Sequence, residues 1–108
     1  MPKSVFVGEF EQLVLLSLLH LEDRGYALPL RRKLNEVAGR KVSRGALYRT
    51  LERLERKGFV TWEVEEAVAR RGGHARRRYT VTEAGLDALR ASRHALLELW
   101  EGLEEVLR

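Results

Sequence analysis

Arginine and lysine side chains gather in two stretches of this sequence, where their spacing points to a defined chemistry. Residues 40–57 hold Arg40, Lys41, Arg44, Arg49, Arg53, Arg56 and Lys57 against only two acids, Glu52 and Glu55. Residues 68–78 hold Arg70, Arg71, Arg76, Arg77 and Arg78 with no acid. Guanidinium groups bond phosphates and the edges of guanine, and unpaired like charges repel one another without a polyanion. The middle of the chain is therefore predicted to bind a polyanion.

Other kinds of chemistry find little support in the residues. The chain has no cysteine, so it offers neither a disulfide nor a thiolate metal site. Its histidines, His20, His74 and His94, are too scattered for a metal site. No phosphate loop, nucleophile elbow or zinc-protease helix occurs. Glu63, Glu65 and Glu66 crowd one segment, which we interpret as a solvated face. We predict no metal, no cofactor and no enzyme activity.

Length and hydropathy limit where such a protein works. The 108 residues fit one small domain. The most apolar stretch, residues 13–21, is too short to cross a bilayer, and the N-terminus lacks the pattern of a signal peptide. We expect a cytoplasmic protein that does not contact a membrane.

Three helices are predicted to position the first basic stretch. A central helix covers about residues 8–21, and a second runs from Pro29, its first helical residue, to Gly39. The third begins after Ser43, whose side chain can cap it, and ends at Gly58. The apolar stripes of the second and third helices are Leu30, Leu34 and Val37, and Leu47, Leu51 and Leu54.

A hairpin and a last helix are predicted to follow. Val60, Trp62 and Val64 alternate with polar residues, as do Tyr79 and Val81, so two strands flank a basic, glycine-containing tip. Thr82 can cap a final helix, whose heptad seam continues to the end of the chain. The seam consists of Leu86, Leu89, Arg93, Leu96, Trp100, Leu103 and Leu107.

This order of elements predicts a mostly α fold with a small β-hairpin. We divide it into a winged helix-turn-helix domain, residues 1–81, and a C-terminal dimerisation helix, residues 82–108. The winged order favours double-stranded DNA as the polyanion, with the outer side of the third helix in the major groove and the hairpin tip on the phosphates or in the minor groove. The predicted DNA contacts are Lys41, Ser43, Arg44, Gly45, Tyr48, Arg49, Arg53, Arg71, Gly72, Gly73, Arg76, Arg77 and Arg78.

The seam of the last helix is predicted to pair with a second copy. A helix of this length cannot bury all its leucines against so small a domain, and two-fold dimers are the commonest oligomers. An intrachain helix folded onto the core is the alternative. Trp100 has two interpretations: a seam residue, which we favour, or with Leu96 the wall of a pocket for a small aromatic effector.

Residues 8–16, 43–58, 71–73 and 77–85 together resemble the PadR family of transcriptional regulators. The combination of the block from Gly45 to Gly58, the Gly-Gly wing and the Tyr79-x-x-Thr82-x-x-Gly85 stretch carries the resemblance. It implies a dimeric winged helix of the branch with one C-terminal helix, usually a repressor and sometimes released by phenolic or drug-like compounds. It also implies backbone contacts for Tyr48 and the wing arginines.

The sequence departs from that family at two positions. Some drug-sensing relatives carry a tryptophan near the position of Leu96, whereas this chain has its tryptophan one turn later, at Trp100. Arg78 stands where the wing commonly has a tyrosine.

From the basic stretches, the seam and the resemblance together, we predict a sequence-specific regulator, a repressor that binds a palindromic operator as a homodimer. The alternative is a winged-helix module that binds an acidic protein partner without DNA.

Overall fold

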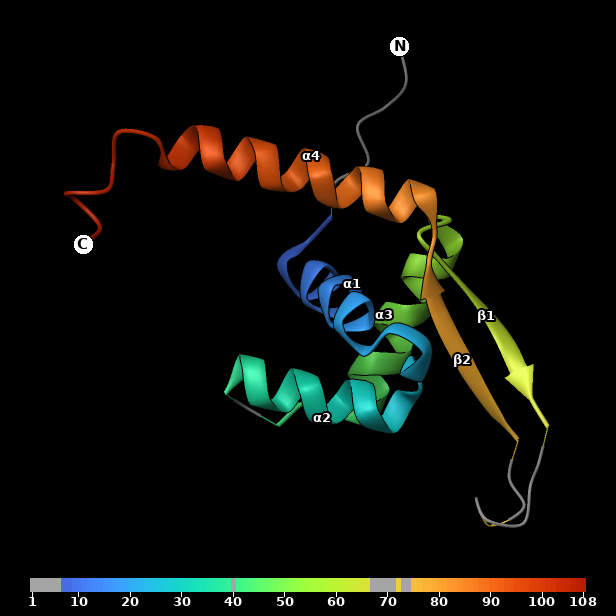
Figure 1. The fold of residues 1–108 in the computed structure, drawn as a ribbon. Helices are drawn as coiled ribbons and strands as arrows, with labels where there is room; N and C mark the ends of the chain where they lie inside the picture. The colour runs from blue at the N-terminus through green and yellow to red at the C-terminus, as the bar shows by residue number, and fades with distance from the viewer. Residues whose placement is uncertain (1–6, 40, 67–71, 73–74) are drawn as a thin grey trace.

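The computed structural model describes residues 7–39, 41–66, 72 and 75–108 as a small helical body with a protruding hairpin (Figure 1). The elements follow in the order α1 (Glu9–Leu21), the 3-10 turn η1 (Glu22–Arg24), α2 (Ala27–Ala38), α3 (Arg44–Arg56), β1 (Val60–Glu65), β2 (Arg76–Val81) and α4 (Glu83–Trp100). The predicted mostly α fold with one hairpin is confirmed.

Helix α1 lies at the centre of the molecule. It contacts α2, α3, β2 and α4, and Val14, Leu15 and Leu18 are buried along it. Leu16 and Leu19 of the same helix remain partly exposed. The rest of the buried core consists of Val7, Leu21, Leu30, Leu34, Val42, Leu47, Leu51, Leu54, Phe59, Val60 and Tyr79. The core thus joins α1, α2, α3 and both strands, and α4 reaches it only through Ala88 and Leu89.

Helix α2 differs from its prediction in its first residue and in the last residue of its apolar stripe. It begins at Ala27, two residues before the expected Pro29, which instead occupies the first turn. Leu30 and Leu34 are buried as predicted, but Val37 is 58% exposed because the last turn lies outside the core. Gly39 ends the helix in the left-handed conformation, with a φ of 65°, as predicted.

Helix α3 forms as its sequence predicts. The Ser43 hydroxyl accepts a hydrogen bond from the Ala46 backbone N–H at 3.1 Å. Leu47, Leu51 and Leu54 are buried against the core, so the opposite side of α3 faces solvent. The long polar side chains of this helix are consequently presented outward.

Strands β1 and β2 pair antiparallel, with Val60 opposite Val81 and Glu65 opposite Arg76. The backbone also ties β2 to the segment before α2, because the Tyr79 N–H donates to the Gly25 carbonyl at 2.8 Å. A Cβ on Gly25 would lie 2.3 Å from the Tyr79 carbonyl oxygen, so this approach requires glycine. The hairpin stem is therefore fixed to the helical body.

Helix α4 begins as predicted and ends earlier than predicted. The Thr82 hydroxyl accepts from the Gly85 N–H at 3.1 Å, which caps the helix. The helix stops at Trp100, where Glu101 leaves the helical region and Gly102 has a φ of 85°. The expected seam to Leu107 is therefore wrong as one continuous helix. Leu103 and Leu107 instead line a small apolar hollow with Leu96, Leu99 and Trp100.

Candidate nucleic-acid interface

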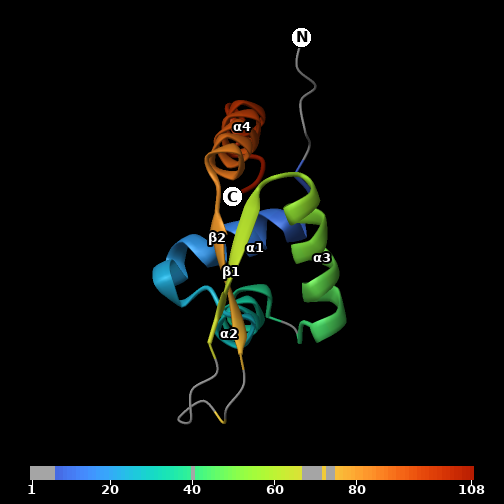
Figure 2. The same ribbon diagram turned by 90° about the vertical axis from the view of Figure 1, so that its right-hand side faces the viewer.

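The first two turns of α3 present an exposed polar surface. Arg44, Gly45 and Arg49 are exposed, and Tyr48 is 37% exposed. Among the described residues, no carboxylate forms an ion pair with Arg44 or Arg49. In Figure 2 the start of α3 lies at the same end of the molecule as the Glu65 and Arg76 ends of the hairpin, and α4 lies at the opposite end.

Gly45 and Arg49 lie one above the other on this surface. A Cβ on Gly45 would lie 3.1 Å from the Arg49 guanidinium, so the guanidinium group covers the glycine. The absence of a side chain at Gly45 leaves room for this position of the Arg49 side chain. Arg49 thereby lies over the first turn, the part of a recognition helix that enters a groove first.

The connection between α2 and α3 is held by side chains from α2. The Asn35 amide oxygen accepts from the Val42 N–H at 2.7 Å, and Arg31 donates to the Val42 carbonyl at 3.3 Å. Val42 is buried, whereas the predicted contacts Lys41 and Ser43 on either side of it are exposed. This anchoring fixes how the start of α3 is presented.

Arg53, also predicted to contact DNA, is engaged inside the chain. Its Nε lies 3.5 Å from the Glu11 carboxylate, and it donates to the Thr50 hydroxyl at 3.2 Å. Lys57 donates to both oxygens of the same carboxylate at 2.9 Å. Arg53 lies one turn after Arg49 on α3, but its guanidinium group is engaged with Glu11 of α1 and with Thr50.

Glu11 is a carboxylate that is only 5% exposed, and its burial was not predicted from the sequence. Burial raises its pKa, but the hydrogen bonds from Lys57 and the Gly8 N–H, together with the charges of Lys57 and Arg53, outweigh burial and lower the pKa below its ordinary value. The Gly8-x-x-Glu11 spacing at the start of a helix is the one signal that could have indicated this role.

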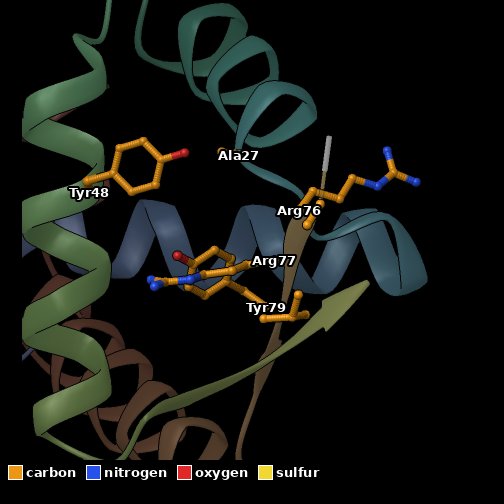
Figure 3. Close-up of a pocket in the computed structure, with 7 residues that line it drawn as sticks. Ala27, Tyr48, Arg76, Arg77 and Tyr79 are labelled. Carbon is orange, nitrogen blue, oxygen red and sulfur yellow. The ribbon is translucent and has the colours of Figure 1, made fainter. Parts of the chain in front are cut away.

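The inner face of the hairpin stem carries Trp62, Val64, Arg77 and Tyr79. The Arg77 guanidinium stacks over the Trp62 ring at 3.9 Å, and the Trp62 N–H donates to Glu55 of α3 at 2.9 Å. A groove of about 560 Å³ separates this face from α3 and the start of α2. Figure 3 shows Tyr48 and Arg77 projecting into it from opposite sides.

The outer face of the stem carries Arg76 and Arg78 opposite Glu65 and Glu63. Glu65 accepts from the Tyr26 hydroxyl at 2.8 Å and lies 3.5 Å from Arg76 Nε. The hydrogen bond from Tyr26 is the largest cause that lowers the pKa of Glu65, and it raises the pKa of Tyr26. Glu65, which the sequence places on a solvated acidic face, remains partly exposed, and the fold adds Tyr26 to its partners.

The hairpin tip can be compared with its prediction only in part. Gly72 is exposed in a turn with a φ of 76°, while Arg71 and Gly73 lie outside the described residues.

Within the part of the chain that the structure describes, no group of three or more potential metal-binding side chains occurs. In that same part, none of the helices is both long and apolar enough to cross a membrane.

The predicted seam of α4 is divided between core and surface. Leu86 and Leu89 are half-buried, while Arg93, Leu96 and Trp100 are exposed. An apolar groove of about 480 Å³ runs between α4 and α1. Its lining includes Leu16 and Leu19 of α1 as well as Leu96, Leu97 and Trp100 of α4.

Comparison with known proteins agrees with this architecture. The model of the transcriptional regulator PadR-like family matches residues 15–91. No curated protein matches the chain in sequence.

Solved structures with the same fold come from several organisms. A PadR-like transcription factor from Bacteroides fragilis is 28% identical, with a TM-score of 0.71, over 90% of this chain and 88% of that one. RosR from H. salinarum is 29% identical, with a TM-score of 0.69, over 93% of this chain and 83% of that one. A PadR family transcriptional regulator from Eggerthella lenta is 25% identical, with a TM-score of 0.63, over 90% and 85%. The chain therefore belongs to the PadR-like family of transcriptional regulators, and it is a DNA-binding regulator and not an enzyme.

Proposed function

We propose that this protein is a sequence-specific repressor that binds a palindromic operator as a homodimer. The observation that carries the proposal is the exposed start of α3, where Arg44 and Arg49 have no acidic partner among the described residues. An arginine at that position can bond the O6 and N7 atoms of a guanine. A cytoplasmic location belongs to the same proposal, because the regulator works on chromosomal DNA.

The surface of α4 supports the proposed dimer. Leu96, Leu97 and Trp100 are half-exposed and border the groove with Leu16 and Leu19 of α1. A second copy placed by a two-fold axis would cover these leucines with the same residues from its own chain. That symmetry also sets two α3 helices on one duplex, which is the arrangement that a palindromic operator requires.

A small aromatic effector is the second part of the proposal. Leu96 and Trp100 both border the apolar groove, whose volume suits a small ligand. An effector there would lie between α1 and α4 and could change how two copies are held. Quenching of Trp100 fluorescence by phenolic acids or aromatic cations, absent in Trp100→Phe, would support it. An unchanged spectrum across such a panel would remove the effector from the proposal.

The test of DNA recognition begins with selection of bound sequences from random duplexes. Affinity for the selected duplex is then measured at several salt concentrations for the wild type and for Arg49→Ala. We expect affinity to fall steeply with salt. We expect Arg49→Ala to lose about 1–3 kcal/mol and to relax the preference at one base position.

Glu52→Ala on the same helix serves as the matched control, because this exposed acid should not contact phosphate. Its affinity should stay the same or rise. Salt-independent binding, or equal behaviour of Arg49→Ala and the wild type, would contradict the proposal. No discrete complex at sub-micromolar protein would favour the acidic protein partner.

A further inference from the structure

The three consecutive arginines of β2 lie in two different environments. Strand pleating places Arg77 on the inner face with Trp62 and Tyr79, and Arg76 and Arg78 on the outer face. Figure 3 shows the side chain of Arg77 extending toward α3 and that of Arg76 pointing away from it. The three residues are adjacent in sequence, and the alternation of the strand places the middle one on the opposite face from the other two.

The charges of the outer face balance one another. Arg76 and Arg78 lie opposite Glu65 and Glu63 in the strand register. Glu65 lies 3.5 Å from Arg76 Nε and 3.7 Å from Arg78 Nε. Opposite charges on facing strands attract one another and stabilise the pair. Two cations and two carboxylates therefore leave this face with no net charge.

Tyr26 packs against Glu65 and Arg76 from the side of the helical body, and these residues with Arg78 form a polar cluster. The Tyr26 hydroxyl donates to Glu65 at 2.8 Å, and the Arg76 guanidinium stacks on the Tyr26 ring at 3.5 Å. Because Tyr26 is the residue before α2, the cluster fastens the outer face of the stem to the helix-turn-helix. Arg76 is thus engaged by both a carboxylate and an aromatic ring.

Arg77 has a different set of neighbours. The residue opposite it on β1 is Val64, and no carboxylate among the described residues pairs with it. Stacking on Trp62 holds the guanidinium plane but leaves its N–H edge free to donate. Arg76 and Arg77 both border the groove beside α3, but only the side chain of Arg77 extends across it toward α3 and Tyr48 (Figure 3).

We infer that Arg77 is the stem arginine that contacts a DNA phosphate beside the recognition helix, and that Glu65 with Tyr26 withholds Arg76 and Arg78 from DNA. Glu65 is then a positioning residue that limits sequence-independent binding, since it removes two cations from the phosphate-binding set. The inference rests on the proposed function, and it revises the prediction that treated the three wing arginines alike.

The experiment compares Arg77→Ala with Arg76→Ala, a matched pair one residue apart on opposite faces. Affinity for a labelled 20-base-pair duplex of random sequence is measured against salt. We expect Arg77→Ala to make the slope of log K against log salt shallower by about 0.9 per protomer, the value for one lost phosphate contact. Arg76→Ala should keep the slope of the wild type.

Glu65→Gln tests directly whether Glu65 keeps Arg76 and Arg78 from binding DNA. Loss of its charge should release Arg76 and Arg78, so the slope should become steeper by about 0.9–1.8 per protomer, which corresponds to one or two added contacts. A merely structural role for Glu65 would leave the slope unchanged or make it shallower. Circular dichroism and thermal unfolding check that each variant folds. If Glu65→Gln does not fold, the comparison of Arg77→Ala with Arg76→Ala still tests the inference.

The outcomes separate this inference from the proposed function. A wild type whose binding does not depend on salt contradicts DNA binding itself. A wild type that binds with a steep slope, together with equal losses for Arg76→Ala and Arg77→Ala, overturns only the inference. An unchanged or shallower slope for folded Glu65→Gln overturns it as well.

Discussion

At the scale of single residues, Glu11 connects the start of α1 to the end of α3. Its carboxylate binds the Gly8 N–H and Lys57, and it lies near Arg53. A buried carboxylate is stable as an anion only when such partners replace water. Here they do so strongly enough to lower its pKa despite burial.

The lowered pKa gives a prediction for stability against pH. Glu11 should stabilise the fold fully above its ordinary value of 4.5, and the contribution should be lost as pH falls further, through the lowered folded pKa. Glu11→Gln should cost about 1–3 kcal/mol at pH 7, since Lys57 and Arg53 lose their charged partner. The difference from the wild type should shrink as pH falls below 4.5. Urea unfolding at several pH values measures it.

Glu9→Gln provides the control, because it removes an exposed acid from the same turn of α1. Its cost at pH 7 should be a few tenths of a kcal/mol, as for other exposed charges. Equal costs for the two variants at pH 7, or a Glu11→Gln cost that persists at pH 3, would contradict the role assigned to Glu11.

At the scale of elements, two glycines decide how the hairpin meets the helices. Gly25 lies against β2, and Gly85 in the first turn of α4 lies against the segment before β1. Thr82 reinforces the second junction, since its hydroxyl donates to the Gly58 carbonyl at 2.6 Å and its N–H to the Phe59 carbonyl at 3.0 Å. The Thr82-x-x-Gly85 spacing thus has a structural cause.

Gly85→Ala should destabilise the protein although alanine favours helices. The new Cβ would lie 2.5 Å from the Phe59 carbonyl oxygen and 2.8 Å from Val81, and backbone would have to shift. We expect a loss of about 1–3 kcal/mol in the free energy of unfolding, as for other overpacked sites. Denaturant unfolding with an unchanged m-value checks it.

Gly45→Ala is the matched control in the first turns of α3. Its Cβ would meet only the end of the flexible Arg49 side chain, at 3.1 Å. Stability should stay the same or rise by up to about 1 kcal/mol, the helix-propensity gain. A Gly85→Ala variant as stable as Gly45→Ala would show that the α4 junction tolerates a side chain.

At the scale of the whole molecule, the basic and apolar surfaces lie at opposite ends. Figure 2 shows α4 at one end and the start of α3 at the other, with α1 between them. A second copy can therefore cover α4 without blocking the candidate DNA surface. This separation fits the charges of the sequence, because residues 83–108 carry six acids against three arginines, whereas residues 40–57 and 68–78 are basic.

Leu96→Asp tests the proposed dimer at this scale. A carboxylate in the apolar groove would be desolvated by the partner copy, so the variant should sediment as a monomer at concentrations where the wild type is a dimer. His94→Asp adds the same group on the other side of α4 and should remain dimeric. Dimers from both variants would place the contact elsewhere.

Local patterns in the sequence determined most of the elements. Ser43 and Thr82 cap helices as predicted, Gly39 ends α2, and the alternation around Trp62 forms a strand. These features depend on residues a few positions apart, so they can be read without a fold. The end of α4 was missed because the heptad pattern continued through Gly102, whose backbone turns the chain away.

The sequence by itself determined the helix-helix-helix-hairpin-helix order, the exposed arginine face of α3 and the leucine seam up to Trp100. Only the tertiary structure decided which charges are engaged inside the chain. Glu11 meets Lys57, and Tyr26 meets Glu65, across 46 and 39 residues of sequence. No periodicity encodes such distant pairs, because they arise when the helical core brings separate elements together. The fold thereby separates Arg49 and Arg77 from the neighbouring arginines that it neutralises.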